Sequence, residues 1–413
     1  MTLDGVTHPF TLEPLPVTPG TSPERIMRWA LEEMGRGHLR AAESLCRQGV
    51  EQAPQDAALI HVLGLVLHRQ GRHLEALDPI HRSLSLRPET ADFHSNLGSV
   101  LASLGRLAGA IKAFEQALHL APRHPDAQAN LPRVVSEAWN AGLWAASADS
   151  PVAGRSAQTV SGRVSCVMLT CGRPALLTRS VASYRRQAWP DRELIIVFDD
   201  PRLRPGLEAL AGSDGTIRLV FVNERRPLGE LRNIGAAQAT GEFIVQWDDD
   251  DQYHPARIQT QIDRLRASGR RAGVLADQLL FFTASRQLVW IERPGGIEGT
   301  LACCAAKMLL YPPVGLAEDT VLARGYRKLD QLDVLPGKGY LYLRTCHGGN
   351  TWSKSHFGEL RRSSRPRESL RQDLDLLLEH LPAYDLGSAP VEMHGREGRL
   401  GVYEPSSRRF RFG

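Results

Sequence analysis

The sequence lacks the features that would place it in a membrane. No stretch of about 18 uncharged apolar residues occurs among its 413 residues, so no transmembrane helix is expected. Its first twenty residues include Asp4, Glu13 and several prolines, where a signal peptide would have a basic segment followed by an apolar one. We therefore expect no signal peptide, while contact with a membrane surface stays open.

Cysteine is scarce, and the six cysteines follow no zinc-ligand spacing. Cys303 and Cys304 are adjacent, which is unfavourable for a disulfide between them. A reducing compartment, the cytoplasm, is therefore expected. The net charge of +4 is small, and no basic stripe is interleaved with aromatic residues, so nucleic acid is not an expected partner.

A repeat with a period of 34 residues fills the N-terminal part of the chain. Three kinds of residue keep this interval: Pro54, Pro88 and Pro122; Gly37, Gly71 and Gly105; Ala42, Ala76 and Ala110. Small residues let two helices approach closely and proline ends the second helix, so each period predicts a helical hairpin. The period resembles that of tetratricopeptide repeats.

This repeat predicts an all-α domain over residues 23–145. The expected units are three repeats, at about 24–56, 57–90 and 91–124, followed by a capping helix at about 125–143. A disordered N-terminus over 1–22 and a linker over 146–162 flank the domain. Such arrays usually bind a peptide or a partner protein, and the alternative is a role in packing or dimerisation alone.

Alternating strands and helices are predicted from residue 163 onwards. The apolar runs 164–170 and 193–198 are typical of buried parallel strands, and a turn and a helix separate them. Nucleotides bind at the carboxyl ends of the strands in such sheets. The polar residues expected at that edge are Thr170, Arg173, Asp199 and Asp200. Asp199 and Asp200 by themselves would be interpreted as a turn or a helix cap.

Two further segments carry residues suited to a phosphate or a cation. Gly229 and Arg232 lie at the start of a helix, where a phosphate is attracted and Arg232 adds a charged hydrogen bond. Four consecutive carboxylates, Asp248 to Asp251, end another apolar run. Like charges at a strand end favour a bound cation, and oxygen ligands suit Mg²⁺ or Mn²⁺. A solvated acidic loop is the alternative for an isolated run of this kind.

The order of these motifs resembles a known enzyme family. Leu-Arg-Asn-Ile-Gly at 231–235, Gly-Glu-Phe-Ile at 241–244 and the four aspartates at 248–251 are similar to the donor segment of family 2 glycosyltransferases. The resemblance covers about 163–357. It implies an α/β GT-A-like transferase domain, a Rossmann-like mixed sheet, over 163–360. A basic C-terminal extension is expected over 361–413.

The resemblance also implies residue roles on the donor side. Asp248 and Asp250 would form the Asp-x-Asp pair that binds a nucleotide-sugar diphosphate through Mn²⁺ or Mg²⁺, with Asp249 supporting the metal or contacting ribose. His347 would complete the coordination, and a hydrogen-bonded loop histidine is the alternative. The donor expected is a UDP-sugar. The residues implied to hold it are Thr170, Arg173, Asp199, Asp200, Gly229, Arg232, Asp248 and Asp249.

An acid pair is expected on the acceptor side. Glu318 and Asp319 open a helix about 70 residues after the aspartate run, where the resembling family has its acceptor acids. The helix dipole alone would also favour acids there. The resemblance implies that Asp319 is the general base and that Glu318 orients it or binds the acceptor. Segment 294–300 is expected to be a glycine-rich loop, and 339–344 a strand leading to His347, with Trp352 beyond it.

The expected function is therefore an inverting, metal-dependent glycosyltransferase. Its acceptor would be a protein or peptide recruited by the repeats. Two alternatives stay open: a transferase acting on a glycan or lipid-linked acceptor, and a non-catalytic repeat scaffold whose transferase domain has decayed. Nothing in the sequence selects the sugar.

Overall fold

A computed structural model describes residues 18, 20–143, 160–348, 350 and 360–413. The chain divides into two compact units, residues 1–138 and 139–413, which are described separately. Most of the expected disordered N-terminus and of the linker lies outside the described residues, as does Trp352. In the part of the chain that the structure describes, no helix is long and apolar enough to cross a membrane.

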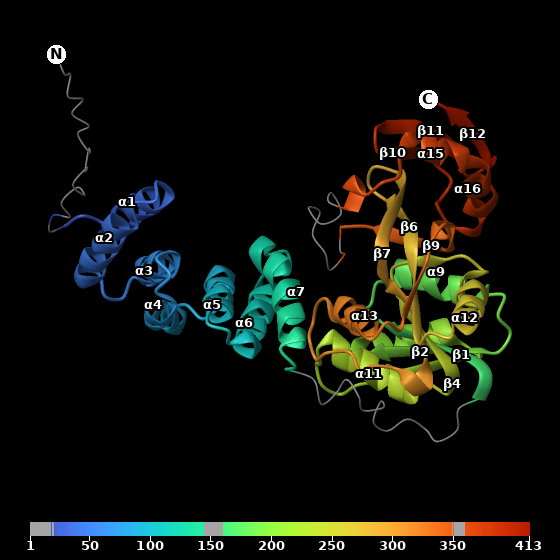
Figure 1. The fold of residues 1–413 in the computed structure, drawn as a ribbon, viewed down its shortest axis with the longest axis horizontal. Coiled ribbons are helices and arrows are strands. Elements are labelled where there is room, and N and C mark those ends of the chain that lie inside the picture. The colour runs from blue at the N-terminus through green and yellow to red at the C-terminus, as the bar shows by residue number, and fades with distance from the viewer. Residues whose placement is uncertain (1–17, 19, 144–159, 349, 351–359) are drawn as a thin grey trace, which may run out of the picture. The chain divides into compact units, whose positions relative to one another are not determined.

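The N-terminal unit is a succession of helix pairs, as the repeat predicted (Figure 1). The helices are α1 (Pro23–Gly35), α2 (Leu39–Gln52), α3 (Ala57–Arg69), α4 (His73–Leu86), α5 (Ala91–Ser103), α6 (Leu107–Leu120) and α7 (Pro125–Asn140). Each period begins at the first helix of a pair. Ala42, Ala76 and Ala110, which keep the repeat interval, are fully buried. The periodic alanines therefore lie in the core of the array. The periodic glycines Gly37, Gly71 and Gly105 were expected at helix contacts, but they are exposed in the turns between paired helices, where φ is positive.

Glycines mark the places where the two helices of a pair touch. A Cβ atom on Gly64 of α3 would lie 2.5 Å from Ile80 Cγ1 of α4. A Cβ atom on Gly98 of α5 would lie 2.8 Å from Phe114 Cε1 of α6. Neither separation is compatible with an added methyl group unless the helices move apart.

Gly64→Ala is expected to destabilise the N-terminal unit by about 1–3 kcal/mol, because the methyl group overpacks the contact with Ile80. The loss should appear as a lower midpoint of the helical unfolding transition in urea, followed by circular dichroism. Gly35→Ala is the matched control, since a Cβ atom there meets nothing within 4 Å. Equal midpoints for the two variants would contradict the packing argument.

The C-terminal unit is built on one mixed sheet, in which the strand order is β12-β11-β10-β7-β4-β1-β2-β3. Its parallel part consists of β1 (Val160–Leu169), β2 (Arg192–Phe198), β3 (Ile217–Phe221) and β4 (Gly241–Asp248). Leu169 of β1 is level with Val197 of β2 and with Asp248 of β4. The carboxyl ends of these strands therefore meet at one edge, which brings the polar residues after them together.

Helices cover both faces of this sheet (Figure 1). One core includes residues of α9 (Pro174–Arg185) and α12 (Arg257–Ser268). The other core includes residues of α11 (Leu228–Gln238) and α13 (Glu318–Lys328). Side chains of β1 alternate between the two, since Cys166 and Met168 join the first core and Val167 joins the second.

Antiparallel strands extend the sheet beyond β4. The longest two are β6 (Ala272–Phe282) and β7 (Gln287–Cys304). The prediction of a loop at 294–300 was wrong. This segment lies within β7, where pairing with β6 continues through shifts of register. The expected strand at 339–344 is also corrected. A 3₁₀ turn, η3 (Gly339–Leu341), precedes β9 (Tyr342–Cys346).

The remaining elements are short. They are η1 (Pro201–Leu203), α10 (Arg204–Ala211), β5 (Gln252–Tyr253), η2 (Ala305–Lys307), β8 (Leu332–Leu335), α15 (Arg367–Gln372), α16 (Leu374–His380), η4 (Leu381–Ala383), β10 (Val391–Gly395), β11 (Gly398–Glu404) and β12 (Arg409–Phe412). β10 pairs in parallel with β7, and β11 and β12 follow it in the sheet. The basic C-terminal segment thus adds strands to this sheet, which was not expected from the sequence.

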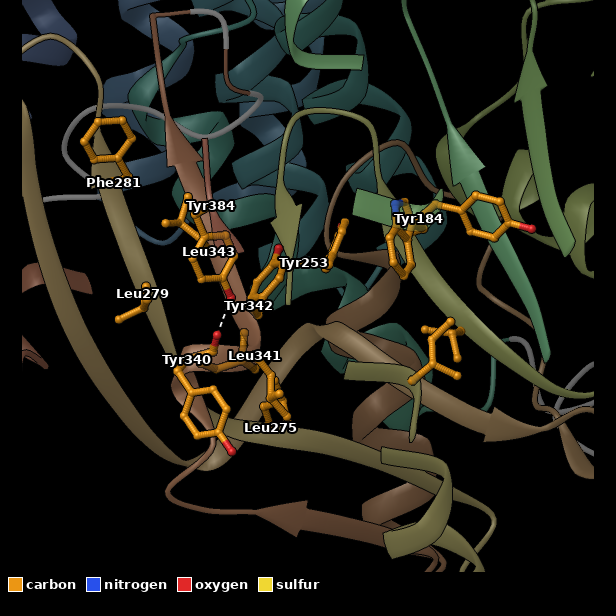
Figure 2. Close-up of a cluster of buried hydrophobic side chains, with 14 of the residues drawn as sticks. Tyr184, Tyr253, Leu275, Leu279, Phe281, Tyr340, Leu341, Tyr342, Leu343 and Tyr384 are labelled. Carbon is orange, nitrogen blue, oxygen red and sulfur yellow. Dashed lines mark hydrogen bonds between the residues drawn. The ribbon is translucent and has the colours of Figure 1, made fainter. Parts of the chain in front are cut away.

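An aromatic cluster supports the end of β4 (Figure 2). The ring centroids of Trp247 and Tyr253 are 3.9 Å apart, and Tyr253 stacks on Tyr342 at 5.3 Å. The backbone N–H of Asp248 donates to the Tyr253 hydroxyl at 2.6 Å. Arg257 is fully buried, and its Cζ atom lies 4.4 Å from the ring centroid of Tyr253. These contacts fix the backbone from which the four aspartates project.

Candidate active site

The four aspartates follow β4 at the edge of the sheet where the parallel strands end. Asp249 and Asp251 are buried, with 4% and 2% of their surface exposed. A cavity of about 130 Å³ opens at this point. Its charged lining residues are Arg173, Arg232, Asp248, Asp249, Asp250, Asp251, Glu318, Asp319 and Arg344. The four aspartates after β4 and the two expected acceptor acids thus line one cavity.

Arg232 connects the two groups of acids. Its Nη2 donates to Asp248 Oδ1 at 3.0 Å, and its Nε donates to Glu318 Oε1 at 2.9 Å. Arg232 is buried on α11, and Glu318 is buried at the first position of α13. Two segments 86 residues apart in the chain are therefore joined through one guanidinium.

The acid pair at the start of α13 is asymmetric. Glu318 is 4% exposed, and burial together with the charge of Asp319 raises its pKa to about 7, although Arg232 opposes the rise. Asp319 is half-buried, and its Oδ1 accepts from Thr320 N at 2.7 Å. Glu318 is thus held as the partner of Arg232, while Asp319 faces the cavity beside it.

Arg173 connects the first turn of the sheet to the aspartate run. Its Nη1 contacts Asp250 Oδ2, and its Nη2 lies 3.4 Å from Asp249 Oδ1. Thr170 donates to Asp249 Oδ2 at 2.7 Å. Burial raises the pKa of Asp249 to about 6 against the opposing charge of Arg173. Thr170, Arg173, Asp249 and Asp250 therefore form one connected group of polar contacts.

His347 lies next to this group. Its Nε2 is 3.2 Å from Asp250 Oδ2 and 3.2 Å from Arg173 Nη1. Among the described residues, no three His, Cys, Asp or Glu side chains lie together as metal ligands. Asp248, the third expected ligand, is instead hydrogen-bonded to Arg232. The structure therefore brings Asp250 and His347 together and holds Asp248 in a different contact.

Besides Thr170, which bonds to Asp249, three expected donor residues lie outside the lining of the cavity. Asp199 and Asp200 follow β2. Asp200 accepts from Arg202 N at 2.9 Å, and hydrogen bonds from Arg202 lower its pKa to about 2. Gly229 lies where a Cβ atom would be 1.8 Å from the carbonyl oxygen of Pro312, so close packing explains the glycine. The donor contacts of these three residues stay predictions.

Two residues at the site were missed or left without a firm role by the sequence analysis. Arg344 of β9 lines the cavity. Asp251 accepts from Thr345 N at 2.8 Å and from the Tyr342 hydroxyl, and burial raises its pKa well above the usual range. Alternation along β9 could have indicated Arg344, since Tyr342 and Arg344 project on the same side of a strand. Asp251 fastens the aspartate run to β9.

Comparisons with known proteins found matches to both parts of the chain. Residues 165–298 match the family model described as "Glycosyl transferase family 2". Residues 27–84 and 91–124 match two models described as "Tetratricopeptide repeat". Among curated proteins, the succinoglycan biosynthesis protein ExoO of Rhizobium meliloti (strain 1021) is 31% identical over 99 residues. That match covers 24% of this chain and 28% of ExoO.

Solved structures show likeness to each unit. Residues 1–349 of S. aureus TarS, in complex with UDP-GlcNAc, are 16% identical over 54% of this chain and 72% of that chain, with a TM-score of 0.39. The first tetratricopeptide domain of Spaghetti (RPAP3), bound to an HSP90 peptide, is 17% identical over 28% of this chain and 91% of that chain, with a TM-score of 0.27. From the family models, the chain carries tetratricopeptide repeats followed by a family 2 glycosyltransferase domain.

Proposed function

We propose that this chain transfers a sugar from a nucleotide diphosphate-sugar to an acceptor hydroxyl, with inversion at the anomeric carbon. The observation that carries the proposal is the Arg232 bridge, which ties the donor aspartate Asp248 to Glu318, the neighbour of Asp319. A donor held by the aspartate run would therefore lie within the cavity that Asp319 also lines.

The proposed reaction is a single displacement. The acceptor oxygen forms a bond to the anomeric carbon while the bond from that carbon to the diphosphate oxygen breaks. Asp319 takes the acceptor proton, because a neutral hydroxyl is a weak nucleophile. The nucleoside diphosphate leaves with the bonding electron pair. Attack from the face opposite the leaving group inverts the configuration.

Mn²⁺ or Mg²⁺ is the cofactor that we propose, with Asp250, Asp248 and His347 as its candidate ligands. Such ions are commonly held by one or two carboxylates together with substrate phosphates. The carboxylates here supply hard oxygen donors, so the residues present fit an ion that arrives with a diphosphate. When bound, the ion would offset the charge on the leaving diphosphate. Glu318 and Arg232 would position the base and the donor aspartate.

The repeat unit suggests the class of acceptor, and the motifs of the C-terminal unit suggest the donor. Tetratricopeptide repeats usually bind peptides or proteins, so we propose a protein or peptide acceptor, or a docking partner. A glycan or lipid-linked acceptor remains the second candidate. The donor that we propose is a UDP-sugar, on the resemblance of the donor motifs. A cytoplasmic location is part of the proposal, because the spacing of the six cysteines in the sequence favours a reducing compartment.

A donor screen tests the proposal. Full-length protein is incubated with Mn²⁺ and single nucleotide sugars, and the released nucleoside diphosphate is measured. The wild type should release nucleoside diphosphate from one of the donors, and Asp250→Ala should not. Asp263→Ala, which alters an exposed aspartate of α12, should behave as the wild type. Nucleotide release that is the same in Asp250→Ala as in the wild type would leave only the scaffold interpretation.

Glu318 gives the reaction an expected pH dependence. Its raised pKa of about 7 means that the carboxyl group is neutral below that pH, so Arg232 loses its ionised partner as the pH falls. We expect kcat/KM to fall about tenfold from about pH 8 to about pH 6, because kcat/KM reports ionisations of the free enzyme. Glu318→Gln should lose this limb of the profile. An unchanged limb in that variant would assign the ionisation to another group.

A further inference from the structure

The guanidinium of Arg173 lies where the proposed ligands of the metal ion meet. Arg173 immediately precedes α9, and its Nη1 contacts Asp250 Oδ2. The same Nη1 is 3.2 Å from His347 Nε2, and His347 Nε2 is 3.2 Å from Asp250 Oδ2. Arg173, Asp250 and His347 therefore form a triangle of contacts. A positive charge of the protein already occupies the side of Asp250 that faces His347.

Within this triangle, Arg173 supplies the positive charge that lies beside the carboxyl group of Asp250. Burial opposes the charge on Arg173, yet the carboxylates of Asp250 and Asp249 raise its pKa above the usual range. Burial would raise the pKa of Asp250, but the hydrogen bond with His347 and the charge of Arg173 lower it. In this geometry the guanidinium of Arg173 lies against the carboxyl groups of both Asp250 and Asp249.

One N–H group of Arg173 donates no hydrogen bond within the described residues. Its Nε is buried and has no hydrogen-bond partner among the described residues. Such a donor costs free energy, which a ligand oxygen can recover. Arginine presents its N–H groups as a fork that fits two oxygens of a phosphate. A diphosphate in the cavity that Arg173 lines would therefore offer its side chain a better partner than Asp250.

We propose that Arg173 is a resident cation that competes with a divalent ion for Asp250, and that the donor diphosphate relieves this competition by drawing Arg173 to itself. The inference rests on the proposed function. A guanidinium and a divalent ion beside the same carboxylate repel each other, so metal binding to the donor-free protein is weak. Metal and nucleotide then bind with positive coupling, because the nucleotide moves the competing charge away.

The test measures Mn²⁺ binding to the full-length protein without nucleotide, from the electron paramagnetic resonance signal of free Mn²⁺. Arg173→Met and Arg173→Gln should each bind Mn²⁺ about tenfold more tightly than the wild type, a size usual for coupled sites. Arg179→Met is the matched control, because it removes a guanidinium from the same helix, where Arg179 pairs with Asp385. The control should bind Mn²⁺ as the wild type does.

Two further comparisons make the result specific. The gain in affinity should disappear in Arg173→Met combined with Asp250→Asn, since the vacated carboxylate is then absent. With UDP, GDP or ADP added separately, at least one nucleotide should tighten Mn²⁺ binding in the wild type, and tighten it less in Arg173→Met. Thermal melting by circular dichroism confirms that each variant is folded.

The outcomes separate this inference from the proposed function. If nucleotide promotes Mn²⁺ binding but both Arg173 variants bind Mn²⁺ alone no better than the wild type, the competition is refuted and the proposed function stands. If no protein binds Mn²⁺ with any of the three nucleotides, the metal-dependent function fails, and this inference fails with it.

Discussion

Asp319→Asn is expected to lower the rate of sugar transfer by about 10²- to 10⁴-fold, the usual contribution of a general base. The asparagine keeps the shape of the side chain but cannot take the acceptor proton. Donor affinity should stay unchanged, because the donor contacts are assigned to other residues. Transfer rates with saturating donor and isothermal titration with the donor and Mn²⁺ measure the two effects.

Asp330→Asn provides the control for this substitution. Asp330 lies just beyond the other end of α13, is exposed and pairs with Arg270. Its conversion to asparagine should leave both transfer and donor affinity as in the wild type. A transfer rate for Asp319→Asn equal to that of the control would remove Asp319 from the reaction. Loss of donor affinity in step with the rate would make it a donor contact.

Arg232→Met is expected to destabilise the C-terminal unit by about 3–5 kcal/mol, since it leaves a buried carboxylate without its partner. Glu318 and Asp248 would both lose the hydrogen bonds that Arg232 donates. For a unit of this size, such a loss lowers the melting temperature by roughly 10 °C. Differential scanning calorimetry of the full chain should show the change in the transition of this unit alone.

Two controls separate charge loss from the loss of the bridge. Arg226→Met, on an exposed arginine that pairs with Glu224 and Glu230, should leave the melting temperature unchanged. Glu318→Gln removes one of the two acids, so adding Arg232→Met to it should cost less than in the wild-type background. Full additivity of the two substitutions would show that the bridge does not couple the two acids.

The residues at the strand ends could be predicted because they depend on local pattern. Apolar runs that end in polar residues define the carboxyl edge of a parallel sheet, and the register of β1 with β4 then sets Thr170 close to Asp249. The helical repeats were predictable for a similar reason, since the 34-residue interval recurs at buried alanines of the helices and at glycines of the turns between them. Both inferences need only neighbours along the chain or along one edge.

The contacts of the arginines could not be predicted in this way. Arg232 was expected to reach a phosphate, but in this structure it pairs with Glu318 because α11 and α13 lie on the same face of the sheet. Arg173 was expected at the nucleoside, and it contacts Asp250 and His347. Such pairings depend on which helices share a face, and the spacing of charges in the sequence does not carry that information.

Short or irregular strands were also difficult to predict from the sequence. The glycines of 294–300 suggested a loop, yet tertiary pairing with β6 keeps this segment in β7. In β10, Val391 and Met393 are buried and alternate with the less buried Glu392 and His394. Alternation over five residues is typical of a half-buried strand, but it does not show which strand β10 pairs with.

The most direct test measures binding of the nucleotide sugar to two variants. It asks whether the acids after β4 bind the donor while Asp319 of α13 acts only on the acceptor. Isothermal titration of the donor found by screening, with Mn²⁺ present, would compare Asp250→Asn and Asp319→Asn with the wild type. The account predicts that Asp250→Asn loses at least about tenfold in donor affinity, while Asp319→Asn binds as the wild type does. Wild-type affinity in Asp250→Asn would contradict it.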